Sequence, residues 1–238
     1  MKKSATKPTI VVLHGWTLDP AVTTKWQPFL KLLKKAGFVV KSWPLPGLTI
    51  KKDTSLTLED YVAWLDQKTK NLPPFILLGH SFGGQLAAQF ACVYPNRVNR
   101  LILIDSSGII DPAISKILKR SVFKLAAKVG RAVTKSTKLR QLLYTLARET
   151  DYYEANEAQR QTMSNLLQRD LTEHLPHITA PTLIIWGQYD AVTPLKLGRV
   201  FANRIPQATL KLIAGARHSP IYTHPQQTLK LITEFLKA

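Results

Sequence analysis

The chain has 238 residues, of which 33 are Lys or Arg and 15 are Asp or Glu, so its formal net charge is +18. Hydrophobic residues make up 45% of it, which excludes a disordered chain, because such chains lack the apolar surface that offsets the entropy lost on ordering. A single cysteine, Cys92, excludes an internal disulfide framework and disfavours a cysteine metal cluster. No apolar run reaches the roughly 18 residues of a membrane span, and the apolar stretch at residues 10–13 is too short for a signal peptide. We therefore expect a cytoplasmic protein.

Short apolar runs alternate with helical patterns along the chain. Short runs rich in aliphatic and β-branched residues predict strands at residues 9–13, 38–43, 75–78, 98–104, 182–186 and 209–213. The run at residues 9–13 is continuous, which is typical of a strand buried on both faces. Helical periodicity and start signals predict helices at residues 24–36, 57–70, 82–94, 194–204 and 225–236. Strands separated by helices form right-handed βαβ units. The predicted fold class is therefore α/β, a doubly wound, mostly parallel sheet of about six strands flanked by helices.

Residues 108–176 interrupt this alternation, because they contain no strand-like run and their periodicity is helical. Between Lys116 and Arg140 there are nine basic residues and no acidic one. Apolar residues recur on one face of this stretch and basic residues on the other, which predicts an amphipathic helix with a cationic outer face. We expect residues 108–176 to form a helical cap inserted into a core made of residues 1–107 and 177–238.

The most specific motif of the chain is Gly79-His80-Ser81-Phe82-Gly83-Gly84. It has the pattern Gly-x-Ser-x-Gly, and it lies directly after a predicted strand and directly before a predicted helix. The flanking glycines permit the tight strand-to-helix turn that exposes a serine hydroxyl at the edge of a sheet. A serine in this place also lies at a helix N-terminus, where backbone N–H groups favour negative charge.

With these motifs the sequence resembles the α/β-hydrolase family, in particular its serine esterases and lipases with a helical cap. Besides the glycine-serine motif, the resemblance rests on His14-Gly15-Trp16, on Gly187-Gln188-Tyr189-Asp190 and on Gly215-Ala216-Arg217-His218. These motifs are spread over nearly the whole chain outside the insertion, and the order Ser, Asp, His is that of the family. The resemblance implies a hydrolase with a catalytic triad that needs no metal and no organic cofactor.

The candidate catalytic residues are Ser81, His218 and Asp190. An unactivated serine needs a general base, and His218 follows the last strand, where loops meet the carboxyl edge of the sheet. We expect the His80 side chain to point away from the Ser81 hydroxyl. A carboxylate must orient the base, and Asp190 follows the strand at residues 182–186. Asp105 is the alternative, because some relatives place the acid after the preceding strand; it can also be read as a carboxylate that caps the next loop.

Trp16 and Phe82 are the candidate oxyanion-hole and substrate-binding residues. Their backbone N–H groups are expected to bind the negative oxygen that develops during acyl transfer. Their side chains either flank the reacting carbonyl or pack against the turn, and the sequence favours neither interpretation.

The predicted function is that of a carboxylesterase, which cleaves a small-molecule ester through an acyl-enzyme. Two alternatives use the same triad, a C–C bond hydrolase and a thioesterase on an anionic acyl substrate. An alternative of another class is a basic protein that binds a membrane surface, since basic amphipathic helices do so. We expect a weak contact with an anionic membrane surface and no nucleic-acid partner, because no basic groove with interleaved aromatic residues is present. The sequence does not predict an oligomeric state.

Overall fold

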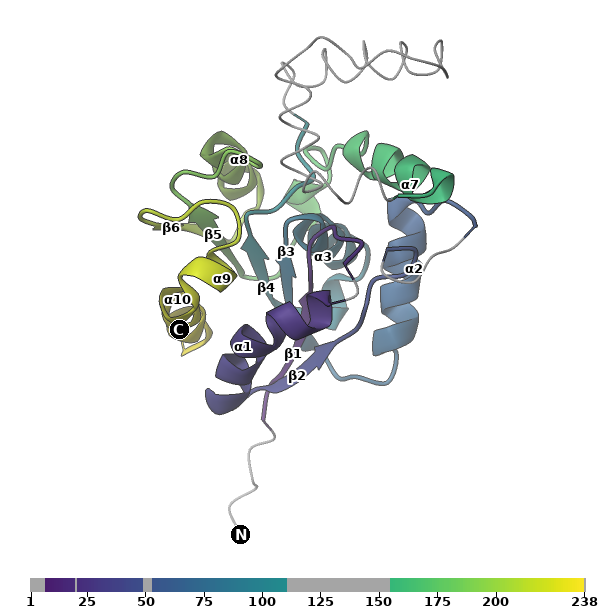
Figure 1. Ribbon diagram of the computed structural model, residues 1–238. Helices are drawn as coiled ribbons and strands as arrows, with labels where there is room; N and C mark the ends of the chain where they lie inside the picture. Colours follow the sequence, from purple (N-terminus) through teal and green to yellow (C-terminus); the bar gives the residue numbers. More distant parts are fainter. Residues whose placement is uncertain (1–6, 20, 49–52, 111–154, 238) are drawn as a thin grey trace.

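The structure is a computed structural model that describes residues 7–19, 21–48, 53–110 and 155–237 (Figure 1). Within these residues the chain forms a six-stranded sheet in the order β2-β1-β3-β4-β5-β6, in which every pair of neighbours is parallel. The strands are β1 (Thr9–Leu13), β2 (Val39–Ser42), β3 (Phe75–His80), β4 (Val98–Ile104), β5 (Thr182–Gly187) and β6 (Ala208–Ile213). The predicted α/β fold with a parallel sheet of six strands is confirmed.

Helices connect and cover these strands. They are α1 (Val22–Lys35), α2 (Leu58–Thr69), α3 (Phe82–Val93), α7 (Glu157–Leu167), α8 (Leu195–Arg204), α9 (Pro220–Thr223) and α10 (Pro225–Lys237), with single turns η1 (Pro95–Arg97) and η2 (Leu175–His177). The five core helices that the sequence predicts are present within a few residues of their expected bounds. Thr57 begins α2 with a capping box, in which its hydroxyl accepts a hydrogen bond from Asp60 N while the Asp60 carboxylate accepts one from Thr57 N. The short helix α9 was not predicted, because four residues are too few for a periodic pattern.

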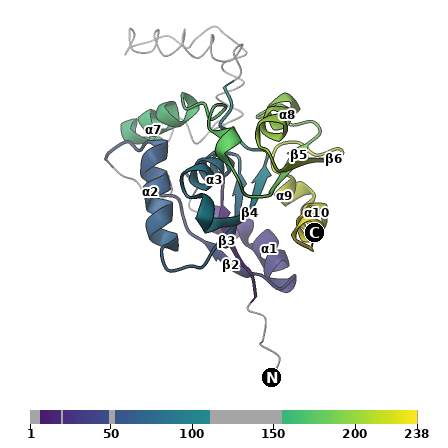
Figure 2. The ribbon, with the colours of Figure 1, turned by 180° about the vertical axis from the view of Figure 1, so that it is seen from behind.

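The helices form a layer on each face of the sheet, as the two opposite views show (Figures 1 and 2). Along β1, Val11 and Leu13 belong to the core cluster shared with α2, α3 and α8, whereas Ile10 and Val12 belong to the cluster shared with α1, α9 and α10. Successive side chains of a strand point to opposite faces, so a strand between two helical layers is apolar at every position. Because all the strands are parallel, their carboxyl ends lie at one edge of the sheet, where the loops that follow them converge.

The predicted cap is described only in part. Residues 111–154, which include the basic stretch between Lys116 and Arg140, lie outside the described residues. The helix α7 is described, and its polar side chains bond to backbone groups of two core loops. Leu56 N donates to Thr162 Oγ1 at 2.8 Å, and Gln159 Nε2 donates to Leu48 O at 2.8 Å. The helix α7 is thus attached to the core beside α2.

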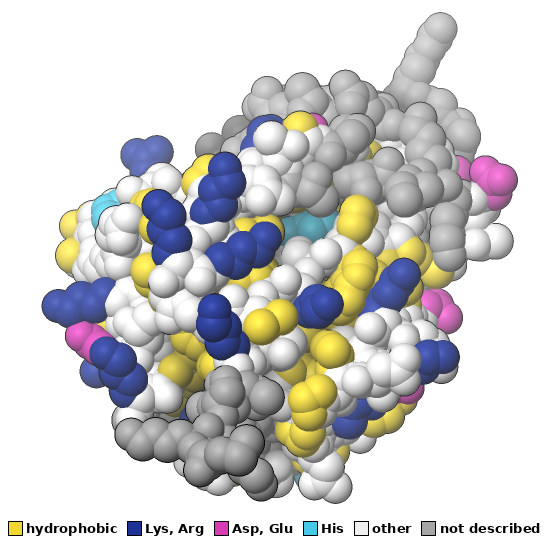
Figure 3. Space-filling model, turned by 90° about the horizontal axis from the view of Figure 1, so that it is seen from below, with side chains coloured by type: hydrophobic (Ala, Val, Ile, Leu, Met, Phe, Trp, Pro, Cys, Tyr) yellow, Lys and Arg dark blue, Asp and Glu magenta, His cyan; other side chains and the backbone are white. Residues whose placement is uncertain are grey.

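Basic side chains are spread over the described surface. Figure 3 shows one face of the molecule, on which Lys and Arg side chains lie among apolar ones and Asp and Glu side chains are fewer. Residues 191–233, which include α8, β6 and α9, carry six Lys or Arg and no Asp or Glu. None of the described helices combines the length and the apolar character needed to cross a membrane.

Candidate active site

Ser81 lies at the turn that joins β3 to α3. Its backbone has φ 54° and ψ −120°, a conformation that residues with a side chain rarely adopt. The turn needs small residues on both sides: a Cβ on Gly79 would lie 2.1 Å from Gly83 O, and one on Gly83 would lie 2.3 Å from Leu13 O. The Gly-x-Ser-x-Gly pattern is thus explained by backbone atoms that approach too closely for any larger residue.

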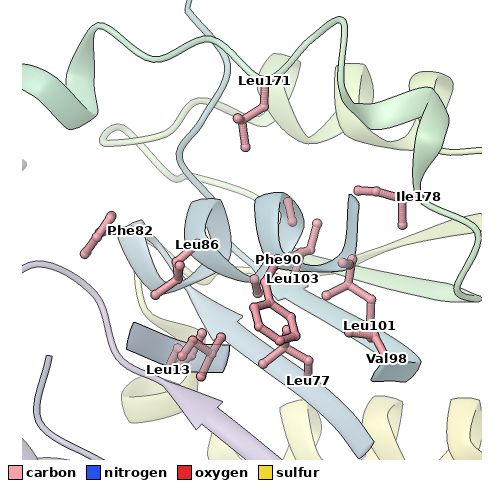
Figure 4. Packing of buried hydrophobic residues seen from close by; sticks show 14 of the residues in the cluster. Leu13, Leu77, Phe82, Leu86, Phe90, Val98, Leu101, Leu103, Leu171 and Ile178 are labelled. Carbon is pink, nitrogen blue, oxygen red and sulfur yellow. The ribbon is translucent and has the colours of Figure 1, made fainter. Parts of the chain in front are cut away.

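The helix α3 holds this turn in place because it is packed on almost every side. Figure 4 shows Leu86 and Phe90 of α3 directed at strand residues such as Leu77 and Leu103, all of them fully buried. Apolar residues of this kind stabilise by roughly 2 kcal/mol each on burial. The N-terminus of α3, and with it Ser81, is therefore fixed against the sheet.

The side chains of His218 and Asp190 meet at the same edge of the sheet. The Nδ1 atom of His218 lies 2.8 Å from Oδ2 of Asp190, whose side chain is fully buried. The other carboxylate oxygen, Oδ1, accepts hydrogen bonds from Val192 N at 2.7 Å and from Thr193 N at 3.0 Å. An imidazole that donates through Nδ1 to a carboxylate keeps a lone pair on Nε2, which is the arrangement of a general base.

Ser81 is placed at this edge without a direct bond to the base. Within the described residues, no hydrogen bond joins the Ser81 hydroxyl to the His218 imidazole. His80, which directly precedes Ser81, lies next to the base, since the centroids of the His80 and His218 rings are 5.0 Å apart. Hydrogen bonds of catalytic groups are often long before a substrate binds, so this geometry is compatible with proton transfer from Ser81.

A small cavity of about 30 Å³ opens beside Ser81. Its lining is mostly apolar and consists of Trp16, Ser81, Phe82, Gln85, Ser107, Met163, Leu166 and Leu167. The last three come from α7, so the described part of the predicted insertion forms one wall of the cavity. Phe82 serves two contacts, because it lines the cavity and its ring also packs edge-on against Tyr61 of α2, with centroids 5.0 Å apart. Both sequence interpretations of Phe82 therefore have a structural counterpart.

The backbone N–H groups of Trp16 and Phe82 have no acceptor among the described residues. Phe82 is the first residue of α3, where an N–H has no partner within the helix. The two residues line the same cavity as Ser81. Unpaired donors beside a nucleophile are suited to bind a developing oxyanion.

His80 and His14 are buried histidines whose roles differ from that of His218. Burial, and next the positive charge of His218, hold the pKa of His80 well below its usual range. Burial also lowers the pKa of His14, whose Nδ1 lies 2.7 Å from Gly15 O while its Nε2 accepts from Leu45 N at 3.2 Å. His80 Nε2 is 3.0 Å from Ser219 Oγ, so the His80 ring contacts the loop that carries His218.

Asp105, the alternative acid, lies close to His218 but bonds elsewhere. Its Oδ1 accepts a hydrogen bond from Gly187 N at 2.8 Å, and its Oδ2 accepts one from Ser219 N at 2.9 Å. Burial, and next the charge of Asp190, raise the pKa of Asp105 to about 7, although His218 and the two backbone hydrogen bonds act in the opposite direction. The geometry thus favours Asp190 as the partner of His218. It differs from the capping interpretation of Asp105, because the carboxylate accepts from Gly187 and Ser219 and, among the described residues, from no N–H of the loop that directly follows it.

His80, Asp105 and His218 each offer a ligand atom, and these atoms lie within 4.8 Å of one another. Such a group could in principle hold a cation. Here both oxygens of Asp105 accept backbone hydrogen bonds, and Nδ1 of His218 bonds to Asp190. The closeness of the three side chains is therefore explained by a hydrogen-bond network.

Two residues of this site were missed by the sequence reasoning. The Thr193 hydroxyl lies 2.8 Å from Asp190 Oδ2 and 3.1 Å from Asp105 O, so it joins the two acid-bearing loops. Gln85 Nε2 donates to Leu166 O at 3.0 Å and to Arg169 O at 3.1 Å, which fastens the end of α7 to α3. The signal in the sequence was a polar side chain, Gln85, in the otherwise apolar first turns of α3 directly after the serine motif.

A family model described as the alpha/beta hydrolase family matches residues 10–231. The chain belongs to this family, as the sequence motifs predict. Among characterised proteins it is similar to a pimeloyl-[acyl-carrier protein] methyl ester esterase of Aromatoleum aromaticum, with 28% identity over 97% of this chain and 99% of that protein. It is also 28% identical to a monoacylglycerol lipase of Xenopus laevis, over 99% of this chain and 77% of that protein.

Solved structures share the fold at lower sequence identity. An alpha/beta hydrolase enzyme from a sediment metagenome of the Mar Chica lagoon superimposes with a TM-score of 0.69 at 23% identity, over 97% of this chain and 90% of the other. A thermophilic esterase of Thermogutta terrifontis does so with a TM-score of 0.64 at 24% identity, over 97% of this chain and 89% of the other. These similarities concern the fold.

Proposed function

We propose that the chain is a carboxylesterase in which Ser81 is the nucleophile, His218 the general base and Asp190 the acid that orients the base. The observation that carries this proposal is the 2.8 Å hydrogen bond between His218 Nδ1 and the buried Asp190 carboxylate, at the sheet edge where Ser81 occupies a strained turn. The relatives named as ester hydrolases give it independent support.

The proposed reaction has two steps. His218 Nε2 takes the proton of the Ser81 hydroxyl as its oxygen attacks the ester carbonyl, and the imidazolium then protonates the departing alcohol. In the second step His218 takes a proton from the water that attacks the acyl-enzyme carbonyl. The imidazolium then returns this proton to Ser81 Oγ as the bond between Ser81 and the acyl group breaks and the acid is released. Asp190 stays ionised throughout and stabilises the imidazolium by its hydrogen bond.

The negative oxygen of each tetrahedral intermediate would accept hydrogen bonds from the N–H groups of Trp16 and Phe82. Loss of one such donor costs about 3 to 4 kcal/mol of transition-state stabilisation in comparable sites. Both donors are backbone groups, so substitution of either side chain removes packing and leaves the donor in place.

The substrate class that best fits the described cavity is an ester with an apolar group. Trp16, Met163, Leu166 and Leu167 present apolar side chains beside Ser81. The division of the chain into a core and a helical insertion at residues 108–176 stays a prediction, and among its described residues those of α7 line the cavity.

The test of the nucleophile combines turnover with covalent labelling. Ser81→Ala should reduce kcat on p-nitrophenyl esters by about 10⁶-fold, as loss of a triad nucleophile does. A fluorophosphonate should add to the wild type, with the mass increase located on the peptide that contains Ser81. Ser164→Ala, in α7 but outside the lining of the cavity, serves as a matched serine control and should keep full activity. Equal activity of Ser81→Ala and the wild type would refute the proposal.

A second candidate substrate is an ester on an anionic carrier. The net charge of +18 and the relatives named for an acyl-carrier protein ester favour it. Association of a basic protein with an anionic substrate weakens as salt screens the charges. The kcat/KM for a methyl ester on an anionic carrier should therefore fall steeply with salt, while that for a neutral aryl ester stays constant. An acyl-coenzyme A and a vinylogous diketone in the same panel distinguish thioesterase and C–C hydrolase activity.

A further inference from the structure

Asp105 is a fully buried carboxylate that the proposed reaction does not use. It follows β4 directly and has φ 43°, in the left-handed region. Both of its oxygens accept backbone hydrogen bonds, one from Gly187 N at 2.8 Å and one from Ser219 N at 2.9 Å. The side chain thus reaches two segments that are far from it, and from each other, in the sequence.

These two segments carry the proposed acid and the proposed base. Gly187 ends β5 and begins the loop that leads to Asp190. Ser219 follows His218 directly. Its φ of 78° is uncommon for a residue with a side chain, so the backbone next to His218 has an unusual conformation that other groups must maintain. One carboxylate therefore fixes the positions from which both members of the His218–Asp190 pair extend.

The two loops have other bonds, but none at the peptide next to His218. Tyr189 N donates to Ala216 O at 2.8 Å, and Gln188 N donates to Ile213 O at 3.1 Å. Ser219 makes three hydrogen bonds: its N–H donates to Asp105, its hydroxyl bonds to His80 Nε2 at 3.0 Å, and its carbonyl accepts from Tyr222 N at 3.0 Å. Of these three bonds, the one to Asp105 connects the peptide N–H next to His218, through the Asp105 carboxylate, to the start of the Asp190 loop at Gly187.

We propose that Asp105 is a positioning residue of the hydrolytic site, which joins the acid-bearing and base-bearing loops through Gly187 and Ser219 and so maintains the Asp190–His218 hydrogen bond. This inference rests on the proposed function, in which His218 and Asp190 act as a pair. Its physical basis is that a displacement of about 1 Å of a catalytic group can lower a rate 10²-fold.

The groups that face Asp105 are Asp190, His218 and His80. Burial raises the pKa of Asp105 to about 7, so its carboxylate takes up a proton, and one of its oxygens becomes a donor, as the pH falls through about 7. The asparagine of Asp105→Asn does not titrate, so the variant lacks this contribution to the loss of rate at acidic pH. The acidic limb of the rate profile should then move to lower pH, an effect that a purely structural role of Asp105 would not produce.

Asp105→Asn is the informative variant, because Asn tolerates the left-handed conformation and has nearly the same shape. It keeps one acceptor oxygen and replaces the other by an amino group, which cannot accept from a backbone N–H. We expect kcat on a p-nitrophenyl ester to fall about 10²-fold with KM changed less than about twofold. The acidic limb of kcat/KM should move down by about one pH unit. The matched control is Asp66→Asn, which removes a carboxylate of α2 that pairs with Arg97. This variant should change neither kcat nor the position of the acidic limb.

Two measurements by NMR need no substrate. In the wild type, the amide protons of Gly187 and Ser219 should shift together, with one midpoint, when the Asp105 carboxyl carbon titrates. In Asp105→Asn, the downfield Nδ1–H signal of His218 should weaken or move upfield. Separate midpoints for the two amides in the wild type would overturn the inference even if the variant does not fold.

The kinetic outcomes separate this inference from the proposed function. If Ser81→Ala is inactive while Asp105→Asn keeps the wild-type kcat and pH profile, Asp105 is not a positioning residue and the esterase proposal stands. If Ser81→Ala is active, the proposed function fails, and the two amide titrations still decide whether Asp105 joins the loops.

Discussion

The Nε2 atom of His80 lies 3.0 Å from the hydroxyl of Ser219, so the residue before the proposed nucleophile bonds to the residue after the proposed base. Ser81 has φ 54° and Ser219 has φ 78°, so uncommon backbone conformations occur at both ends of this connection. Strained residues persist where the surrounding structure holds them, and they concentrate at functional sites. The bond between His80 and Ser219 is part of what holds these two turns together.

The contribution of this bond can be measured with Ser219→Ala. The change leaves the Nε2 atom of the buried His80 without its partner, so the free energy of unfolding should fall by about 1 to 3 kcal/mol. Urea unfolding followed by tryptophan fluorescence measures it. Ser219→Gly is the companion variant, because it also lacks the hydroxyl but adopts a positive φ without strain. It should be destabilised less than Ser219→Ala, and an unchanged stability in both variants would show that the bond contributes nothing.

Strain at Ser81 leads to a second prediction, on two inactive variants. Ser81→Ala and Ser81→Gly both remove the nucleophile, but only alanine keeps a Cβ at φ 54° and ψ −120°. Strain at such a residue amounts to about 1 to 3 kcal/mol, of which the greater flexibility of glycine in the unfolded chain offsets up to about 1 kcal/mol. We therefore expect Ser81→Gly to unfold at higher urea concentration than Ser81→Ala. The reverse order would mean that the turn is not strained.

Much of the fold could be predicted because its signals are local. The strand β4 was predicted with its observed bounds, Val98–Ile104, since a short run rich in aliphatic residues between helical patterns indicates a buried strand. The helix predicted at residues 57–70 corresponds to α2, whose start signal is local, since Thr57 and Asp60 form their capping box within four residues. The turn at Ser81 could be predicted because the backbone of the turn itself requires glycine at position 79, where a Cβ would lie 2.1 Å from Gly83 O.

The contacts of Thr193, Gln85 and Asp105 could not be predicted in the same way. Asp105 bonds to backbone groups 82 and 114 residues away, and Gln85 bonds to carbonyls 81 and 84 residues away. Such bonds depend on how loops meet after the sheet has formed, and they leave no periodic pattern in the sequence. The motifs indicated which residues gather at the sheet edge, but not how their side chains pair there.

Gln85 supports a third prediction, on the wall of the cavity. Gln85→Met keeps the shape of the side chain but removes the Gln85 donor from Arg169 O and from Leu166 O, of which only Leu166 O keeps a backbone donor, Arg169 N at 3.2 Å. The change should destabilise the protein by about 1 to 3 kcal/mol. Because Leu166 lines the cavity, KM for an apolar ester should rise as well.

Gln89 provides the matched control for this change. It is also buried on α3, and its Oε1 has no hydrogen-bond partner among the described residues. Gln89→Met should therefore leave the stability unchanged or raise it. Both variants are compared by urea unfolding and by initial rates on the same ester. Equal losses in the two variants would mean that the two bonds to α7 do not hold the wall.

The raised pKa of Asp105 gives a prediction on how stability depends on pH. Its pKa is about 7 in the folded protein, whereas an unperturbed aspartate has about 3.9. Between these values the folded state binds a proton that the unfolded state releases, so this group stabilises the fold at low pH and loses that contribution as the pH rises through about 7. The lowered pKa values of His80 and His14 act in the opposite direction, since both rings must take up protons on unfolding below about pH 6.5.

The effect of Asp105 is isolated by comparing the wild type with Asp105→Asn, since both keep His80 and His14. The difference in unfolding free energy, wild type minus variant, should increase as the pH falls from about 8 to about 5, by at most about 1.4 kcal/mol per pH unit. Urea unfolding at four pH values in this range measures it. A difference that stays constant with pH would mean that Asp105 does not titrate in this range, and one that decreases would mean that its pKa is lowered by folding.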